Sequence, residues 1–467
     1  MMRKFTVFLL LNLLSVSGKS LYAQDFFKFS GNIKNFDEDA ISFTLYKNWV
    51  EEPTDLQLKL DKKGNFVVEF PLEEIAYCDI NIGDEGFYLW KIEPKDNIIL
   101  NADFNAFQET FKISGEGSEK WLYLLAQKKA FETDKDWDFE LENLKKVSKK
   151  GYFDLTNYLI TEQINLLNKY KQNLSEDFYS LQRADIYGKY SALELSFLNF
   201  HHIFNEEEFK RFSLKTFNGK TQSKSYDFGH FVEALIENHN VIGKKYDQSI
   251  MLEYESIMAY FSPLDLVDKQ LIERILANKI SLYLDNFGAT EETKLLVGSF
   301  KNFSKNKIYI NVLLDKLSKL QNLREGKEAK QFILPDEKGN LVALKDFKGK
   351  NLVLGFYATW CGPCIEDMQS MRIVDNYFKN ENDLIFVFIN LDNPSEFARF
   401  LKEEPHFGTH LSGFGNKDLK SNYLTEILPN YFLIDKTGTI ISERLDEPST
   451  DEGRSLINHI ESLLYKK

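Results

Sequence analysis

The sequence predicts three folded parts: a small all-β sandwich-like domain, a mainly α-helical middle region and a C-terminal α/β domain. Three observations lead to this prediction. Short β-branched and aromatic runs separated by turn residues fill positions 24–117. No proline occurs between Pro94 and Pro263, which suits long helices. Beyond residue 327, continuous apolar runs alternate with helical patterns, as in a sheet covered on both faces.

Length and charge limit the possible functions. A chain of 467 residues exceeds the size of one hydrophobic core, so we expect two to four domains. Its content of 43% hydrophobic and 28% charged residues is typical of globular proteins. A formal net charge of −13 argues against nucleic acid and anionic membrane surfaces as partners.

Residues 1–23 have the pattern of an export signal. Arg3 and Lys4 precede the apolar stretch 5–16, which is too short to span a bilayer, and a small residue, Ala23, follows. We therefore expect an exported protein of the periplasm or cell envelope. An uncleaved segment that tethers the chain to the membrane is the alternative.

The β domain is predicted over residues 24–117. Its expected strands are 40–46, 56–60, 65–70, 77–82, 88–92 and 98–102. Leu56, Leu58 and Leu60 alternate with polar residues, which indicates a half-buried strand. Cys78 alternates with hydrophobic residues, so we interpret it as a buried strand residue rather than a reactive thiol.

The helical region is predicted over residues 118–326. Leu271 and Ile275 belong to an apolar stripe that follows a predicted helix start at Ser262 and Pro263. A second stripe comprises Ile310, Leu313, Leu317 and Leu320. Such stripes are typical of packed cores. Residues 213–225 are polar and contain glycine, which predicts a long loop.

The last domain is predicted over residues 327–467, after a charged boundary at 324–328. Its expected strands are 352–357, 384–390, 431–435 and 439–443, and its expected helices are 362–380, 395–403, 417–423 and 450–464. Two of the three cysteines of the chain, Cys361 and Cys364, lie where the first of these strands meets the first helix.

That placement suits reversible dithiol chemistry. A thiol at a helix N-terminus faces backbone N–H groups and the positive end of the helix dipole, which favour the reactive thiolate of Cys361. Cys364 lies one turn further on and can resolve a mixed disulfide. A structural staple would gain only about 2 kcal/mol from so short a loop. A zinc site would need His406 and His410, whose spacing is unusual. We expect no metal and no cofactor.

The stretch Trp360-Cys361-Gly362-Pro363-Cys364 resembles a thioredoxin active site, and its surroundings resemble the exported TlpA/ResA-like proteins. Residues 332–336, 339–340 and 344–350 are similar to the opening hairpin of that family, and 428–438 to its proline-containing strand. The resemblance covers 329–464 and implies a thioredoxin-like fold. The front end resembles Gram-negative envelope proteins that carry such a C-terminal domain.

The resemblance also implies roles for single residues. It implies a cis peptide bond before Pro429, with Leu428 and Trp360 beside the cysteines to bind a substrate. Gly362 and Pro363 would tune the redox potential, and their identity resembles that of the reducing members. The implied partners are a disulfide-bearing protein and a membrane-embedded thiol reductant; the sequence does not specify an oligomeric state.

The chain departs from the family pattern in two places. Gly355 stands where thioredoxins usually carry a buried acid or a polar substitute. Asp367 and Met368 replace the usual Glu and Pro after the second cysteine. Because a proton acceptor must serve Cys364, Asp367 is the first candidate and Glu366 the second. A solvated helix face is the alternative interpretation of both acids.

The predicted function is that of an envelope thiol-disulfide oxidoreductase that reduces protein disulfides. Cell redox homeostasis or cytochrome c biogenesis is its expected context. One alternative is a partner-binding envelope protein in which the redox domain is secondary. Another is a thiol peroxidase, although the segment 358–360 lacks the proline of such sites.

Overall fold

The computed structural model describes residues 25–36, 40–131, 145–212, 214–241, 267–403, 407–423 and 428–465. The predicted export signal, the predicted helix start at Ser262 and Pro263, and His406 lie outside these ranges. The described part has the three predicted kinds of structure in the predicted order, which confirms the fold class. None of its helices is long and apolar enough to cross a membrane.

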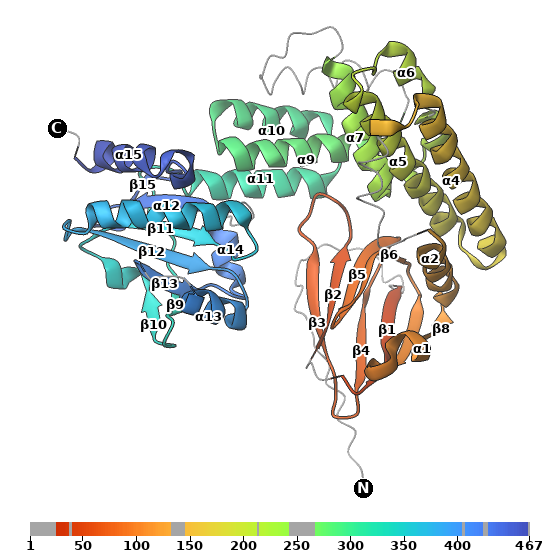
Figure 1. The fold of residues 1–467 in the computed structure, drawn as a ribbon, viewed down its shortest axis with the longest axis horizontal. Coiled ribbons are helices and arrows are strands. Elements are labelled where there is room, and N and C mark those ends of the chain that lie inside the picture. The colour runs from red at the N-terminus through yellow and green to blue at the C-terminus, as the bar shows by residue number, and fades with distance from the viewer. Residues whose placement is uncertain are drawn as a thin grey trace. The chain divides into compact units, whose positions relative to one another are not determined.

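The N-terminal part is a sandwich of two four-stranded sheets, with strand orders β4-β1-β7-β8 and β3-β2-β5-β6 (Figure 1). The first sheet contains β1 (Phe26–Lys34), β4 (Asn65–Pro71), β7 (Asn97–Asp103) and β8 (Lys112–Glu116), and the second β2 (Ala40–Tyr46), β3 (Thr54–Lys59), β5 (Ala76–Ile82) and β6 (Glu85–Ile92). Aromatic rings fill the space between them: Phe27 and Phe29 of β1 each lie 6.0 Å, centroid to centroid, from Phe43 of β2.

Two strands of this sandwich, β1 and β8, were not expected from the sequence. β1 pairs with β4 in antiparallel and with β7 in parallel orientation, so it is a central strand that needs two distant partners. β8 is short and largely exposed, so it carries little of the hydrophobic alternation on which sequence patterns depend. Cys78 of β5 is fully buried, as predicted, and burial raises the pKa of its thiol.

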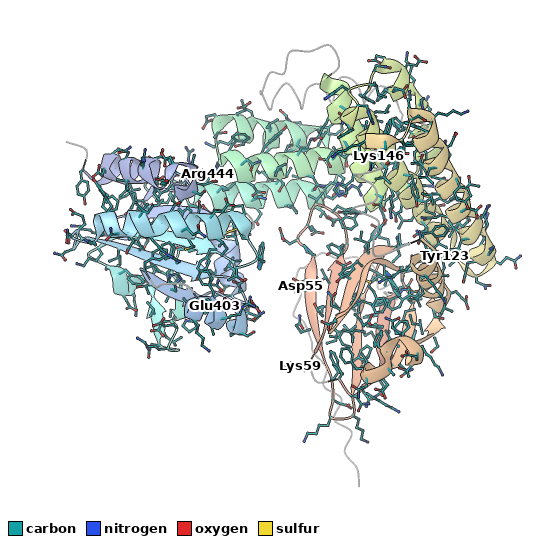
Figure 2. The ribbon with its side chains drawn as sticks, in the orientation of Figure 1. Asp55, Lys59, Tyr123, Lys146, Glu403 and Arg444 are labelled. Atoms are coloured by element: carbon teal, nitrogen blue, oxygen red, sulfur yellow. A yellow bond between two sulfur atoms is a disulfide. The ribbon has the colours of Figure 1, made fainter. Side chains whose placement is uncertain are left out.

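Helices pack beside the sandwich within the same compact unit. They are α1 (Phe107–Thr110), α2 (Ser118–Phe131), α4 (Lys149–Tyr170), α5 (Glu176–Phe200), α6 (Glu206–Arg211) and α7 (Tyr226–Val241). The fully buried Tyr123 of α2 (Figure 2) lies 5.9 Å, ring to ring, from Phe178 of α5. The predicted long loop contains two short 3₁₀ helices, Leu214–Phe217 and Gln222–Lys224, and Leu214 and Phe217 are buried.

A buried polar cluster joins the sandwich to these helices. Asp185 of α5 lies 2.9 Å from the ammonium of Lys91 and accepts hydrogen bonds from Tyr77 Oη at 2.8 Å and Ser225 Oγ at 2.5 Å. All four side chains are buried. A buried charge is tolerated only where it is paired and hydrogen-bonded, so this cluster specifies how β5 and β6 meet α5.

The chain divides into two compact units, and the division falls inside α9 (Lys269–Phe287), between Leu271 and Ile272. The second unit contains the rest of α9, α10 (Glu291–Phe303), α11 (Lys307–Gln321) and the C-terminal α/β part. Leu271 and Ile275 of the first predicted stripe are buried, whereas in the second stripe Leu313 is buried and Ile310, Leu317 and Leu320 are half-buried.

The C-terminal part is built on a five-stranded sheet of order β13-β12-β11-β14-β15 (Figure 1). Its strands are β11 (Asn351–Tyr357), β12 (Leu384–Asn390), β13 (Thr409–Ser412), β14 (Asn430–Ile434) and β15 (Ile440–Ser442). β9 (Ile333–Pro335) and β10 (Leu341–Ala343) form a separate hairpin. The helices are α12 (Gly362–Phe378), α13 (Pro394–Glu403), α14 (Lys417–Tyr423) and α15 (Arg454–Leu464).

The sequence predicted most of these elements but missed β13 and misjudged the last helix. β13 has four residues and pairs with β12 alone within its sheet, so its short pattern gives little signal. The closing helix, predicted from residue 450, is divided into a 3₁₀ turn (Pro448–Asp451) and α15. The division falls at Glu452 and Gly453, which have positive φ values of 59° and 83° and therefore cannot continue a right-handed helix.

Candidate active site

Cys361 is the N-cap residue of α12. Its backbone is extended, with φ −86° and ψ 101°, and Pro363 follows in the first turn, where a proline costs no helical hydrogen bond. The backbone N–H of Cys364 donates a hydrogen bond to Cys361 Sγ, with a donor–acceptor distance of 3.2 Å. The strand β11 ends four residues earlier, at Tyr357, so the helix begins at the carboxyl edge of the sheet.

The two cysteines form a disulfide bond. They differ in access: Cys361 is 7% exposed, whereas Cys364 is fully buried. Trp360 is 75% exposed, and Gly362 and Pro363 are exposed as well. A partner can therefore approach the site over the indole and the Gly-Pro turn, and it meets Cys361 before Cys364.

Asn390 and Asp392, which sequence reasoning did not single out, fix the segment before Cys361. Asp392 Oδ2 accepts a hydrogen bond from the backbone N–H of Thr359 and another from Asn390 Nδ2, both at 2.8 Å. Asn390 and Asp392 are buried. The sequence offered one signal for them, their position at the carboxyl end of the predicted strand 384–390. This strand runs parallel to β11, so the carboxyl ends of both strands lie at the same edge of the sheet, next to Cys361.

The Leu428–Pro429 peptide bond is cis, as the resemblance implied. Leu428 is partly buried and packs against the same hydrophobic cluster that contains Cys361 and Cys364. The structure therefore brings together residues more than 60 positions apart in the sequence. Pro429 is half-buried and is followed directly by β14.

The two acids of the first turns of α12 lie in different environments. Asp367 is 1% exposed, whereas Glu366 is exposed to solvent. Asp367 Oδ1 accepts a hydrogen bond from the backbone N–H of Ser449 at 3.0 Å, and Asp367 Oδ2 has no hydrogen-bond partner among the described residues. Asp367 is thus a buried acceptor one turn beyond Cys364, and Glu366 fits the solvated alternative.

A side chain from a neighbouring strand occupies the space beside Gly355, the position at which thioredoxins usually carry a buried acid. Gly355 of β11 pairs directly with Tyr431 of β14, and a Cβ atom at 355 would lie 2.9 Å from the Tyr431 ring and 2.9 Å from Phe388. The Tyr431 side chain is 2% exposed, and its hydroxyl has no hydrogen-bond partner among the described residues. Burial, followed by the charge of Asp367, raises the pKa of Tyr431 well above its usual range.

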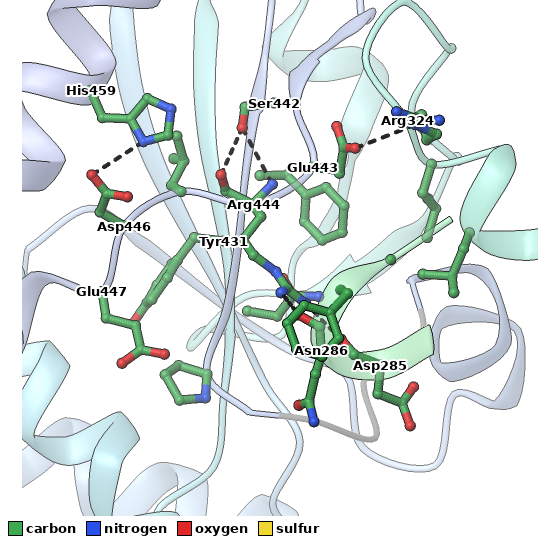
Figure 3. A pocket seen from close by; sticks show the side chains of 18 of the residues that line it. Asp285, Asn286, Arg324, Tyr431, Ser442, Glu443, Arg444, Asp446, Glu447 and His459 are labelled. Atoms are coloured by element: carbon green, nitrogen blue, oxygen red, sulfur yellow. Dashed lines mark hydrogen bonds and ion pairs between the residues drawn. The ribbon is translucent and has the colours of Figure 1, made fainter. Parts of the chain in front are cut away.

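A pocket of about 820 Å³ adjoins this region within the second unit (Figure 3). Tyr431 and Glu447 contribute to one part of its wall, and Asp285 and Asn286 at the end of α9 contribute to another. Pro429 also lines the pocket. Arg444 donates a hydrogen bond to the backbone carbonyl of Asp285 at 2.6 Å and another to that of Asn286. The proline that precedes β14 is therefore accessible from a concave surface.

His410, one of the two histidines that the zinc alternative would need, has other partners. His410 Nδ1 lies 2.8 Å from Tyr357 Oη and its Nε2 lies 3.1 Å from the Phe407 carbonyl oxygen. Within the described ranges, no group of three or more His, Cys, Asp and Glu side chains is placed to hold a metal ion.

A Redoxin family model matches residues 324–457, which include the whole site. The thiol-disulfide oxidoreductase ResA of Bacillus cereus is 32% identical over 136 residues, which are 29% of this chain and 78% of that relative. The chain belongs to the TlpA/ResA-like family of thiol-disulfide oxidoreductases. Its substrates accordingly carry disulfide bonds, and the fold of its C-terminal α/β part is thioredoxin-like.

Other members and structures are similar over the same part. ResA of Bacillus subtilis is 29% identical over 124 residues, which cover 26% of this chain and 67% of that protein. The solved thioredoxin domain of a thiol-disulfide oxidoreductase from Bacteroides vulgatus is 23% identical, covers 30% of this chain and 97% of that domain, and has a TM-score of 0.27. The Redoxin match leaves out the β-sandwich and nearly all of the helical region.

Proposed function

We propose that this oxidoreductase works outside the cytoplasm, in the periplasm or cell envelope, and reduces protein disulfides through Cys361 and Cys364. The observation that carries the proposal is the arrangement of the pair at the start of α12: a slightly exposed N-cap cysteine and a fully buried cysteine a turn later. Such asymmetry assigns attack to Cys361 and resolution to Cys364.

The first step is attack by the Cys361 thiolate on one sulfur of a substrate disulfide. The N-terminal N–H groups of α12, including that of Cys364, stabilise this thiolate. The substrate S–S bond breaks, a Cys361–substrate disulfide forms, and the leaving substrate sulfur takes a proton from solvent. Trp360, Leu428 and Pro429 would hold the substrate segment beside Cys361, and Gly362 and Pro363 leave its approach open.

The second step resolves the mixed disulfide. The Cys364 thiol transfers its proton to the Asp367 carboxylate and attacks Cys361 Sγ; the Cys361–substrate bond breaks and the Cys361–Cys364 bond forms. The released substrate sulfur leaves as a thiolate and takes a proton from solvent, so two electrons have passed from the protein to the substrate, which is now a dithiol. Asp367 suits this role because it is buried one turn from Cys364 with a free carboxylate oxygen, whereas Glu366 faces solvent.

The Gly-Pro dipeptide between the cysteines and the resemblance to reducing members favour reduction over oxidation. A membrane-embedded thiol reductant would regenerate the dithiol. Maintenance of reduced apocytochrome c thiols, or general envelope redox homeostasis, fits such an activity.

The test is insulin reduction with dithiothreitol as the electron source, followed by a redox titration of the Cys361/Cys364 couple. We expect the parent protein to reduce insulin and Cys361→Ser to be inactive. We also expect Cys364→Ser to accumulate a mixed disulfide with a substrate thiol, visible as a mass increase that dithiothreitol removes. Unchanged insulin reduction by Cys361→Ser would refute the proposed chemistry. A potential as oxidising as that of a dedicated disulfide donor would refute the proposed direction.

A further inference from the structure

Tyr431 and Asp367 are two buried polar groups that lie close enough to interact electrostatically. Tyr431 of β14 belongs to the hydrophobic cluster that contains Cys361 and Cys364, and Asp367 is a buried residue of α12, one turn beyond Cys364. The Tyr431 hydroxyl and Asp367 Oδ2 each lack a hydrogen-bond partner among the described residues. Leaving either group unpaired in a protein interior is costly, so a pair of unsatisfied groups at one place requires an explanation.

The strand register shows why a tyrosine fits here. Tyr431 pairs with Gly355, and its ring occupies the space that a side chain at 355 would need, with Tyr431 ring atoms 2.9 Å from the position of a Cβ. Gly355 is one of the two departures from the family pattern, and Asp367 is the other. Tyr431 contacts Gly355 and interacts electrostatically with Asp367, so a single side chain is involved with both departures.

The two groups interact electrostatically although they do not meet at full hydrogen-bond geometry. Burial is the main cause of the raised pKa of Tyr431, and the carboxylate of Asp367 is the next. The phenol therefore stays protonated at neutral pH and is a donor that can turn toward Asp367 Oδ2. The other charge that acts on Tyr431 is Glu447, which lies beside it on the pocket wall (Figure 3).

The remaining titratable groups of this wall have partners elsewhere. His459 Nδ1 lies 3.4 Å from Asp446, and Arg444 is bound to the carbonyls at the end of α9. Tyr431 is therefore the residue of this wall whose hydroxyl is left to interact with Asp367.

We propose that Tyr431 is a positioning residue for the resolving step, and that its hydroxyl donates to Asp367 Oδ2 so that the carboxylate stays charged and ready to accept the proton of Cys364. This inference rests on the proposed function and deepens it. No atom is transferred to Tyr431: the proton passes from Cys364 to Asp367, and the phenol only stabilises the charged acceptor before that transfer.

The test isolates the resolving step without a natural client. The reduced protein reacts in a stopped-flow instrument with 4,4′-dithiodipyridine; attack by Cys361 releases one thiopyridone and resolution by Cys364 releases the second. The rate of the second phase is measured from pH 4 to 9. In Tyr431→Phe, we expect the acid limb of that rate profile to move to higher pH by about one unit, because a hydrogen bond to a charged group changes its protonation equilibrium roughly tenfold or more.

Tyr423→Phe is the matched control. Tyr423 is also a fully buried tyrosine of the same domain, but its hydroxyl donates to the Lys330 carbonyl oxygen at 2.5 Å, away from Asp367. Its removal should lower stability and leave the pH profile unchanged. An acid limb that is identical in Tyr431→Phe and the parent, at equal melting temperature, would overturn the inference.

A second comparison covers the case in which Tyr431→Phe folds poorly. In the Asp367→Asn background the Tyr431→Phe change should have no further effect on the second phase, because the acceptor it serves is gone. Equal slowing in both backgrounds would mean that Tyr431 acts only on packing, which overturns the inference. Its failure differs from failure of the proposed function, in which the second thiopyridone would not be released even by the parent protein.

Discussion

Replacement of Asp185 by asparagine tests whether the buried polar cluster stabilises the first compact unit. Asparagine keeps the volume and one acceptor oxygen but removes the charge. The Lys91 ammonium, 2.9 Å from Asp185 and 5% exposed, would then be a buried charge that has lost its ion-pair partner. The loss of one member of a buried ion pair costs about 3–5 kcal/mol, so we expect a decrease in the free energy of unfolding near the lower end of that range.

The measurement is equilibrium unfolding in urea, followed by tryptophan fluorescence. Four of the five tryptophans belong to the first unit and Trp360 to the second, so replacing Trp360 by phenylalanine in every variant leaves a signal from the first unit alone. The midpoint should fall while the slope with denaturant stays constant.

Two comparisons make the result decisive. The exposed pair of Asp25 and Lys95, 3.5 Å apart, is the control, and Asp25→Asn should cost less than about 1 kcal/mol. The double variant Lys91→Met/Asp185→Leu should recover part of the loss, since two apolar side chains leave no unpaired charge while the Tyr77 and Ser225 hydroxyls lose their acceptor. A loss below about 1 kcal/mol for Asp185→Asn would show that water or rearrangement compensates Lys91, and the reasoning would be wrong.

Three further predictions concern single side chains. Burial, with a further contribution from the charge of Asp185, raises the pKa of Asp227 to about 7 from an ordinary 3.8, so the folded state binds more protons than the unfolded state between these pH values. The free energy of unfolding should therefore fall as pH rises from about 4 to 7, by up to about 1.4 kcal/mol per pH unit. Urea unfolding of Asp227→Asn should lack this decline. Gly355→Ala should lower the free energy of unfolding of the second unit by about 1–3 kcal/mol, because its Cβ would lie 2.9 Å from the Tyr431 ring, and the same change should cost less in a Tyr431→Ala background; equal stability of Gly355→Ala and parent would contradict the register argument. Asp392→Ala should slow insulin reduction several-fold by releasing the backbone before Cys361, with little change in far-UV circular dichroism, whereas a parental rate would show that this hydrogen bond does not position the site.

The redox pair could be predicted from local sequence because its geometry is local. A strand that ends at Tyr357 and a helix that begins at Gly362 place Cys361 at a helix N-terminus, and Cys364 follows within the first turn whatever the rest of the chain does. The same local geometry put Asp367 one turn further on. Most strands and helices of the C-terminal domain were predictable for a similar reason, because their patterns are long and regular.

The surroundings of Cys361 and Cys364 depend on contacts between segments that are distant in the sequence, which no local sequence pattern specifies. Only the fold shows that Asp367 is buried while Glu366 is exposed, that Asp392 holds the backbone of Thr359, and that β1 is a central strand. Gly355 by itself looked like the loss of a functional side chain. The register of β11 with β14 shows Tyr431 in its space, because strand pairing depends on contacts between segments about 75 residues apart, which hydrophobic spacing cannot specify.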